Sequence, residues 1–159
     1  MSRISIYIYL FLLVGLDLGI KKIASSNLIP FEAVDFIPFI NFYLTFNSGI
    51  AFSMFDFGAG ASCYILLIIG LLIVAFLFNQ LFEEDRKDTQ ISYVLIIGGA
   101  LGNIIDRAID GVVTDFLHLY ISNFSFFIFN PADAFITIGA LLLIYSEFKK
   151  GFDGQKSNN

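Results

Sequence analysis

The chain has 159 residues, of which 57% are hydrophobic and 14% are charged, and its formal net charge is −5. A soluble domain of this length cannot bury so much apolar surface, so the composition predicts one integral-membrane domain with several spans. The sequence has no basic block, one cysteine (Cys63) and one histidine (His118), which argues against a nucleic-acid partner, an internal disulfide and a Cys/His metal site.

Four apolar segments are candidates for membrane spans, since a spanning helix needs roughly 20 residues. We expect spans at about 4–24, 59–82, 91–107 and 131–148. The first could be read as a cleavable signal peptide, because Arg3 precedes an apolar run. However, Asp17, Lys21 and Lys22 interrupt the passage to any cleavage site, so we interpret this segment as a retained span.

A β element is expected between the first and second spans, at about 30–57. The stretch 37–46 is rich in aromatic and β-branched residues, a turn signal follows at 47–49, and 50–55 could form a second strand. The predicted fold class is therefore an all-α membrane protein with four transmembrane helices and a small extracytoplasmic β element between helices 1 and 2.

The third span carries small and polar residues on one face. Gly98, Gly99, Gly102, Asn103 and Asp106 fall within an arc of roughly 140° on a helical wheel. The Gly98/Gly102 pair permits close approach of a neighbouring helix. This face alone could be a simple packing motif, but it would also carry polar groups into the bundle.

Two aspartates in separate elements have surroundings that push their proton affinities apart. Asn130 and Pro131 suit the N-cap and first position of a helix, which puts Asp133 in its first turn. Asp133 could merely be a capping carboxylate, but the helix N-terminus also favours the ionised form that a general base requires. Asp115 lies in an apolar segment expected to be extended, where burial favours the protonated acid. Such a pair can act as acid and base.

The distribution of basic residues predicts the orientation in the membrane. On one side of a four-span arrangement lie Arg3, Arg86, Lys87, Lys149, Lys150 and Lys156. Both termini are therefore expected to be cytoplasmic. The polar groups near span ends, including Asp17 and Arg107, then gather at the outer side. Several ionisable residues at one depth indicate a functional site.

The motifs resemble the lipoprotein signal peptidase (signal peptidase II) family. The matching blocks, in the family's order, are Asp17-x-x-x-Lys21, Asn47-x-Gly49-x-Ala51-Phe52, Gly98-Gly99-Ala100-x-Gly102-Asn103-x-x-Asp106-Arg107, Gly111-x-Val113-x-Asp115-Phe116 and Phe129-Asn130-x-Ala132-Asp133. Leu18 departs from the glutamine usual after the first aspartate.

The resemblance implies an aspartic endopeptidase of the bacterial cytoplasmic membrane, with an outer β-cradle and Asp115 and Asp133 as catalytic residues. Its substrates would be prolipoproteins whose lipobox cysteine already carries diacylglycerol, cut just before that cysteine at the outer face. The resemblance implies neither a cofactor nor a metal. It implies that the protein is embedded in membrane lipid, its other partner.

The resemblance also implies supporting roles. Asn103, Arg107 and Asn130 would orient the aspartates and hold substrate carbonyls, and Asn47 and Gly49 would grip the peptide. Asp106 is expected to be structural, fixing Arg107 or capping the third span, as Gly98 and Gly102 are for packing. For Asp17 and Lys21, a surface ion pair and a positioning role both stay open.

Two other functions compete with this interpretation. A transporter or proton channel would use intramembrane carboxylates, but it predicts acidic residues at several depths, whereas the inner halves of the spans are almost uncharged. A structural membrane subunit would explain the glycine face but not Asp115 and Asp133 in separate elements.

Overall fold

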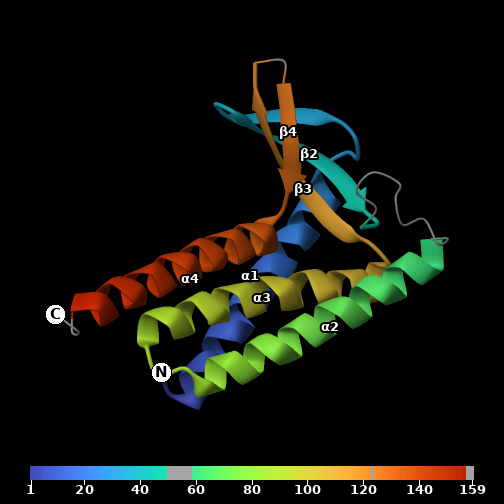
Figure 1. Ribbon diagram of the computed structural model, residues 1–159. Coiled ribbons are helices and arrows are strands. Elements are labelled where there is room, and N and C mark those ends of the chain that lie inside the picture. Colours follow the sequence, from blue (N-terminus) through green and yellow to red (C-terminus); the bar gives the residue numbers. More distant parts are fainter. Residues whose placement is uncertain (50–58, 123, 157–159) are drawn as a thin grey trace.

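Four helices form a bundle that carries a small β-sheet at one end (Figure 1). The computed structural model describes residues 1–49, 59–122 and 124–156. The helices are α1 (Arg3–Asn27), α2 (Ala59–Glu83), α3 (Lys87–Asp110) and α4 (Pro131–Lys156). The strands are β1 (Ala33–Ile37), β2 (Ile40–Asn47), β3 (Val113–Ile121) and β4 (Phe124–Phe129).

Within the described residues, four helices are long and apolar enough to cross a membrane, as the sequence predicts. Their exposed surface is largely apolar, with Phe11 of α1, Leu72 of α2 and Leu141 of α4 each more than 60% exposed. Lipid is the natural solvent for such side chains. The chain is accordingly a multi-pass membrane protein.

Helix α3 is the central helix and packs against the other three. Its glycine face makes this possible: Gly98 abuts Leu13 of α1, and Gly99 abuts the backbone of Ala132 at the start of α4. The predicted packing role of this face is consistent with these contacts. The core of the bundle contains a cluster of buried aliphatic residues: Ile6, Leu10, Val74, Leu81, Val94 and Ile97.

The sheet has the order β1-β2-β3-β4 with every neighbouring pair antiparallel. Among the described residues, β1 and β2 lie between α1 and α2, whereas β3 and β4 lie between α3 and α4. The expectation of an all-α protein with a β element confined to the first connection is therefore only partly right. The cause is long-range pairing: two hairpins from distant connections share a ladder between β2 and β3, which no local pattern reveals.

The first hairpin also differs from its prediction. The expected strand at 37–46 is divided by a turn at 38–39, where Phe39 has φ of 72°. Pro38 has no N–H and cannot donate to a ladder, which favours a turn there. The second strand expected at 50–55 lies outside the described residues.

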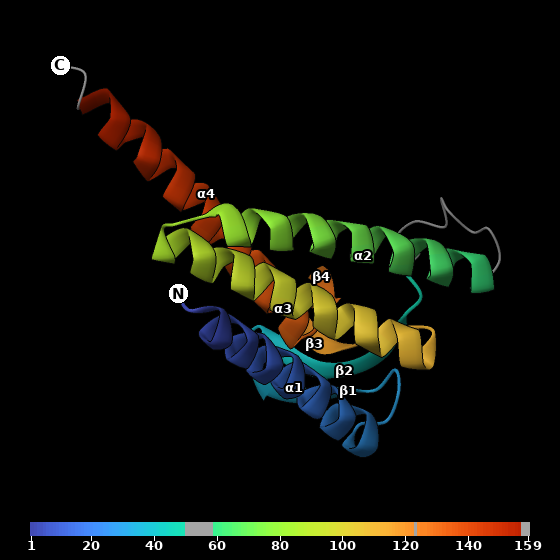
Figure 2. The same cartoon turned by 90° about the horizontal axis from the view of Figure 1, so that it is seen from below.

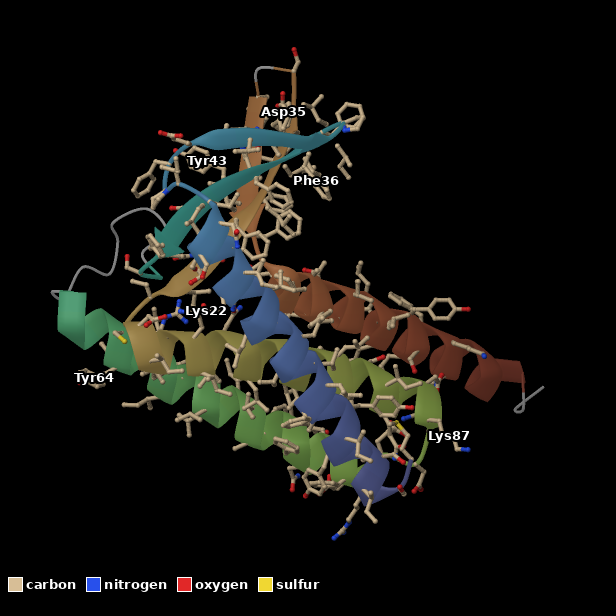
Figure 3. All side chains as sticks on the ribbon, turned by 180° about the vertical axis from the view of Figure 1, so that it is seen from behind. Lys22, Asp35, Phe36, Tyr43, Tyr64 and Lys87 are labelled. Carbon is tan, nitrogen blue, oxygen red and sulfur yellow. The ribbon has the colours of Figure 1, made fainter. Side chains whose placement is uncertain are left out.

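The sheet is anchored on the end of α1, where Leu44 of β2 and Phe116 of β3 pack against Ala24. Both termini and the α2–α3 connection lie at the opposite end of the bundle (Figures 1 and 2). Lys22 and Lys87 mark the two ends (Figure 3). The β3–β4 hairpin and the start of α4 therefore meet at the sheet end of the molecule.

Candidate active site

Asp115 and Asp133, the two aspartates singled out in the sequence, are joined through Asn130. The side-chain Nδ2 of Asn130 donates to Asp115 Oδ1 at 2.6 Å, and its backbone N–H donates to Asp133 Oδ2 at 3.2 Å. Asp115 is on β3 and Asp133 is in the first turn of α4. The fold thus brings together two carboxylates that the sequence alone could not show to meet.

The start of α4 explains the position of Asp133. The helix begins at Pro131, and Asn130 Oδ1 accepts a hydrogen bond from the backbone N–H of Asp133 at 3.0 Å. This is the geometry of an N-cap with an acidic residue in the first turn. The carboxylate thus lies among the free backbone N–H groups of the first turn of α4.

Asp115 lies in a buried part of β3 and is 3% exposed. Burial is the main cause that raises the pKa of Asp115 to about 6, while a hydrogen bond from Asn47 opposes the rise and the nearby charge of Asp133 adds to it. A carboxyl group with this pKa holds its proton more readily than an ordinary aspartate does. The two carboxylates are therefore placed in different electrostatic surroundings.

Asn47 connects the first hairpin to the site. Its Nδ2 donates to Asp115 Oδ2 at 3.0 Å, and its Oδ1 accepts from the backbone N–H of Gly49 at 2.7 Å. Gly49 has φ of 84°, a backbone conformation that favours glycine. The Asn47–Gly49 turn is thus folded against Asp115.

Asn103 of α3 contacts the other aspartate. Its Nδ2 donates to Asp133 Oδ1 at 2.8 Å, and its Oδ1 accepts from Asn130 Nδ2 at 3.1 Å. Arg107, one helical turn further along α3, has its guanidinium beside Gly49: a Cβ added to Gly49 would lie 3.5 Å from Arg107 Nη2. Helix α3 thus supplies the contact of Asn103 with Asp133 and places Arg107 beside the Asn47–Gly49 turn.

Asp17, Lys21 and Asp106 form a buried ion cluster beneath these amides. Lys21 Nζ lies 2.8 Å from Asp17 Oδ2 and 3.3 Å from Asp106 Oδ2. The three residues are 0%, 2% and 6% exposed, so the interpretation of Asp17 and Lys21 as a surface ion pair is wrong. Their side chains turn into the bundle because Gly102 leaves room for Asp17.

The structure gives Asp106 a different contact from the expected ones. Its Oδ2 accepts the backbone N–H of Thr114 at 2.8 Å and lies beside Lys21, rather than fixing Arg107. The end of α3 is instead capped by Gly111, whose N–H donates to the carbonyl of Arg107 at 2.9 Å. Asp106 therefore attaches β3 to the bundle.

Two contributors to the site have no signal in the sequence. The backbone N–H groups of Thr114 and Ala132 are bound by Asp106 and Asp17, at 2.8 and 2.9 Å. Every residue except proline carries such a donor, so only the fold shows which ones are used. Across the described ranges, no three His, Cys, Asp or Glu side chains come together so as to hold a metal ion.

Comparisons with known proteins agree with one another. Residues 9–149 match the family described as signal peptidase (SPase) II. Proteins of Brucella ovis and Brucella canis, each called lipoprotein signal peptidase, are 38% identical over 153 residues, covering 93% of this chain and 94% of theirs.

Two solved structures, each described as a bacterial membrane enzyme determined by the in meso method, have the same fold. One superposes with a TM-score of 0.80 at 29% identity, covering 94% of this chain and 90% of the other. The second gives 0.81 at 30% identity, covering 92% and 94%.

Proposed function

This chain belongs to the signal peptidase II family, and on that basis we propose that it is an aspartic endopeptidase that cuts diacylglyceryl-modified prolipoproteins just before the lipidated cysteine. Family membership makes the chain a peptidase that removes the signal peptides of lipoproteins. The aspartic mechanism, the roles of single residues and the orientation in the membrane are the parts that we propose.

The observation that carries the proposed mechanism is the bridge from Asn130 to both aspartates. Two carboxylates at close quarters in different surroundings can share one proton, and the pair then titrates as a unit. The raised pKa of Asp115 favours Asp115 as the protonated member. With that proton on Asp115, Asp133 is the ionised member of the proposed pair.

In the first step, Asp133 takes a proton from a water molecule, whose oxygen attacks the carbonyl carbon of the scissile amide. Asp115 donates its proton to the carbonyl oxygen, which gives a neutral gem-diol. In the second step, Asp133 gives its new proton to the leaving nitrogen as the C–N bond breaks. Asp115 recovers a proton from the gem-diol, so both groups return to their starting states.

The surrounding side chains support the pair in this scheme. Asn47 and Asn130 both donate to Asp115, and Asn103 donates to Asp133, which holds the two carboxyl groups in fixed orientations. The guanidinium of Arg107 and the turn at Gly49 lie beside this constellation. We assign them to the grip on the substrate peptide.

An apolar groove next to Asp133 suits a lipid-modified substrate. It has a volume of about 440 Å³ and lies between β4 and α4, lined by Phe127, Ile128, Phe129, Asp133, Ala134, Thr137 and Ile138. Diacylglycerol on the cysteine would hold the scissile bond near the membrane interface, where the sheet end of the bundle would lie if both termini are cytoplasmic.

The decisive experiment compares cleavage of a diacylglyceryl-modified precursor and its unlipidated form by the purified protein. The wild type should cut only the lipidated precursor, just before the cysteine. Asp115→Asn and Asp133→Asn should each lower the rate by roughly 10³-fold or more, as loss of a member of a catalytic constellation does. Asp35→Asn, on the exposed strand β1 (Figure 3), is the matched control and should retain the rate.

If the folded wild type leaves the lipidated precursor intact, the proposed activity is wrong. A carboxylate-based transporter would then be the function to test.

A further inference from the structure

The ion cluster of Asp17, Lys21 and Asp106 contacts the backbone immediately before each proposed catalytic aspartate. Asp106 Oδ2 binds the N–H of Thr114, which precedes Asp115, and Asp17 Oδ1 binds the N–H of Ala132, which precedes Asp133. Lys21 lies between the two carboxylates, at 2.8 Å from Asp17 and 3.3 Å from Asp106. The Lys21 ammonium group thus contacts both of the carboxylates that bind the backbone, one at β3 and one at the start of α4.

Lys21 also controls which way the neighbouring amides point. Its Nζ donates to Asn103 Oδ1 at 2.7 Å. An ammonium group has only donors, so the oxygen of the Asn103 amide must face it. The nitrogen of the same amide then faces Asp133 Oδ1, at 2.8 Å.

The orientation of the Asn103 amide in turn determines the orientation of the Asn130 amide. Asn103 Oδ1 accepts from Asn130 Nδ2 at 3.1 Å, and that same nitrogen donates to Asp115 Oδ1 at 2.6 Å. A flipped Asn103 amide would set its nitrogen against the ammonium group and against Asn130 Nδ2, and its oxygen against the Asp133 carboxylate. The Lys21 ammonium group can only donate, and it therefore fixes the direction of the hydrogen bonds that follow it. As a result, Asn103 donates to Asp133 and Asn130 donates to Asp115.

We propose that Lys21 is a positioning residue for the cleavage reaction, which sets the spacing of Asp115 and Asp133 through its two carboxylate partners and orients the amides of Asn103 and Asn130 as donors to them. This inference rests on the proposed function. Lys21 has no direct contact with either aspartate among the hydrogen bonds and ion pairs of the described residues, so it acts through other groups. The expected signature is a loss of turnover with unchanged substrate binding.

The test must remove the ammonium group without leaving two unbalanced carboxylates. Lys21→Met/Asp106→Asn does so, because the cluster keeps its formal charge and the oxygen of the new amide can still accept from Thr114. Its kcat for the lipidated precursor is compared with that of Asp106→Asn alone, so the difference isolates the ammonium group. We expect kcat to fall roughly 10- to 100-fold, the scale of lost supporting partners, with KM within about twofold.

A merely structural lysine would lower the amount of folded protein but not kcat per folded molecule. Equal kcat values for the double variant and Asp106→Asn, in samples with matching thermal unfolding midpoints, would overturn the proposal. Cleavage by the wild type in the same assay separates this result from failure of the proposed function, in which the wild type itself would be inactive.

If the double variant does not fold, Lys21→Arg and Lys21→Gln provide the comparison. Arginine carries only donors, whereas the glutamine amide can present its oxygen to Asn103. We expect Lys21→Arg to retain a higher kcat than Lys21→Gln. Equal values, or a higher value for Lys21→Gln, would contradict the proposal.

Discussion

Asn130 and Asp133 cap each other at the first turn of α4, since Asn130 Oδ1 accepts from the N–H of Asp133 at 3.0 Å and Asp133 Oδ2 accepts from the N–H of Asn130 at 3.2 Å. Asn130 also donates to Asp115 from its Nδ2 at 2.6 Å. The same residue therefore starts a helix and links the two aspartates. These two contributions can be separated by substitution.

Asn130→Ser should keep the helix cap and lose the donor to Asp115, because serine caps helices well but is too short to reach that carboxyl group. Asn130→Ala should lose both. We expect the alanine variant to be less stable than the serine variant by about 1 kcal/mol, and both to cleave the lipidated precursor roughly 10- to 100-fold more slowly than wild type. Thermal unfolding in detergent and initial rates measure the two effects. A serine variant with the wild-type rate would show that the Asn130–Asp115 bond is dispensable.

The stability of the protein should depend on pH through Asp115. Burial raises its pKa from 3.8 to about 6, so the folded state holds the proton more tightly than the unfolded state does. The contribution is fully present below about pH 4 and is lost as pH rises through about 6; it amounts to about 3 kcal/mol. The unfolding midpoint of the wild type should therefore fall between pH 4 and 7 relative to that of Asp115→Asn. Parallel pH curves for the two proteins would contradict this.

The sequence predicts the helices better than the sheet, for a physical reason. An apolar run of spanning length is a local property, and a capping pattern such as that of Asn130 and Asp133 is local too. The ladder between β2 and β3 joins residues such as Thr45 and Asp115, which are far apart in the chain. Such pairing depends on the fold as a whole.

The same distinction holds within the site. The types of Asp115 and Asp133 and their contrasting surroundings can be read locally, whereas their connection through Asn130 cannot. Asp17 and Lys21 show the limit most clearly. Their i,i+4 spacing fits an exposed ion pair as well as a buried one, and only the packing of α1 against the glycine face of α3 decides that both are buried.

The close approach of α3 and α4 should not tolerate a methyl group at Gly99. A Cβ there would lie 2.3 Å from the carbonyl oxygen of Ala132, and backbone at the start of α4 cannot move without shifting Asp133. We expect Gly99→Ala to lower the unfolding midpoint and the cleavage rate together. Gly19→Ala is the control, since a Cβ added there would have no described atom within 4 Å beyond the neighbouring backbone of α1. The glycine face would not be a close contact if both variants behaved alike.

The opposite end of the bundle should contribute stability without affecting chemistry. Arg86 Nη2 donates to Ser146 Oγ at 2.8 Å, and Thr89 Oγ1 lies 2.7 Å from the same oxygen, so the α2–α3 connection is tied to α4. Ser146→Ala leaves a buried hydroxyl at Thr89 without this partner and should cost about 1–3 kcal/mol. The rate per folded molecule should not change. Ser26→Ala, at an exposed position on α1, should alter neither quantity, and a rate loss in Ser146→Ala alone would place the contact in the catalytic pathway.

The proposed orientation in the membrane can be tested with single cysteines. Most basic residues lie at the end of the bundle that carries the termini and the α2–α3 connection (Figures 1 and 2), and cytoplasmic segments are enriched in such residues. The other three basic residues, Lys21, Lys22 and Arg107, lie at the sheet end. Lys21 is buried in the ion cluster and Arg107 is half-buried, so packing within the protein explains the positions of these two.

The experiment uses a Cys63→Ser background. Asp35→Cys on β1 should react with a membrane-impermeant maleimide in intact spheroplasts. Asp85→Cys in the α2–α3 connection should react only after permeabilisation. The reverse pattern would place the two aspartates at the cytoplasmic face, where a substrate anchored in the outer leaflet could not reach them.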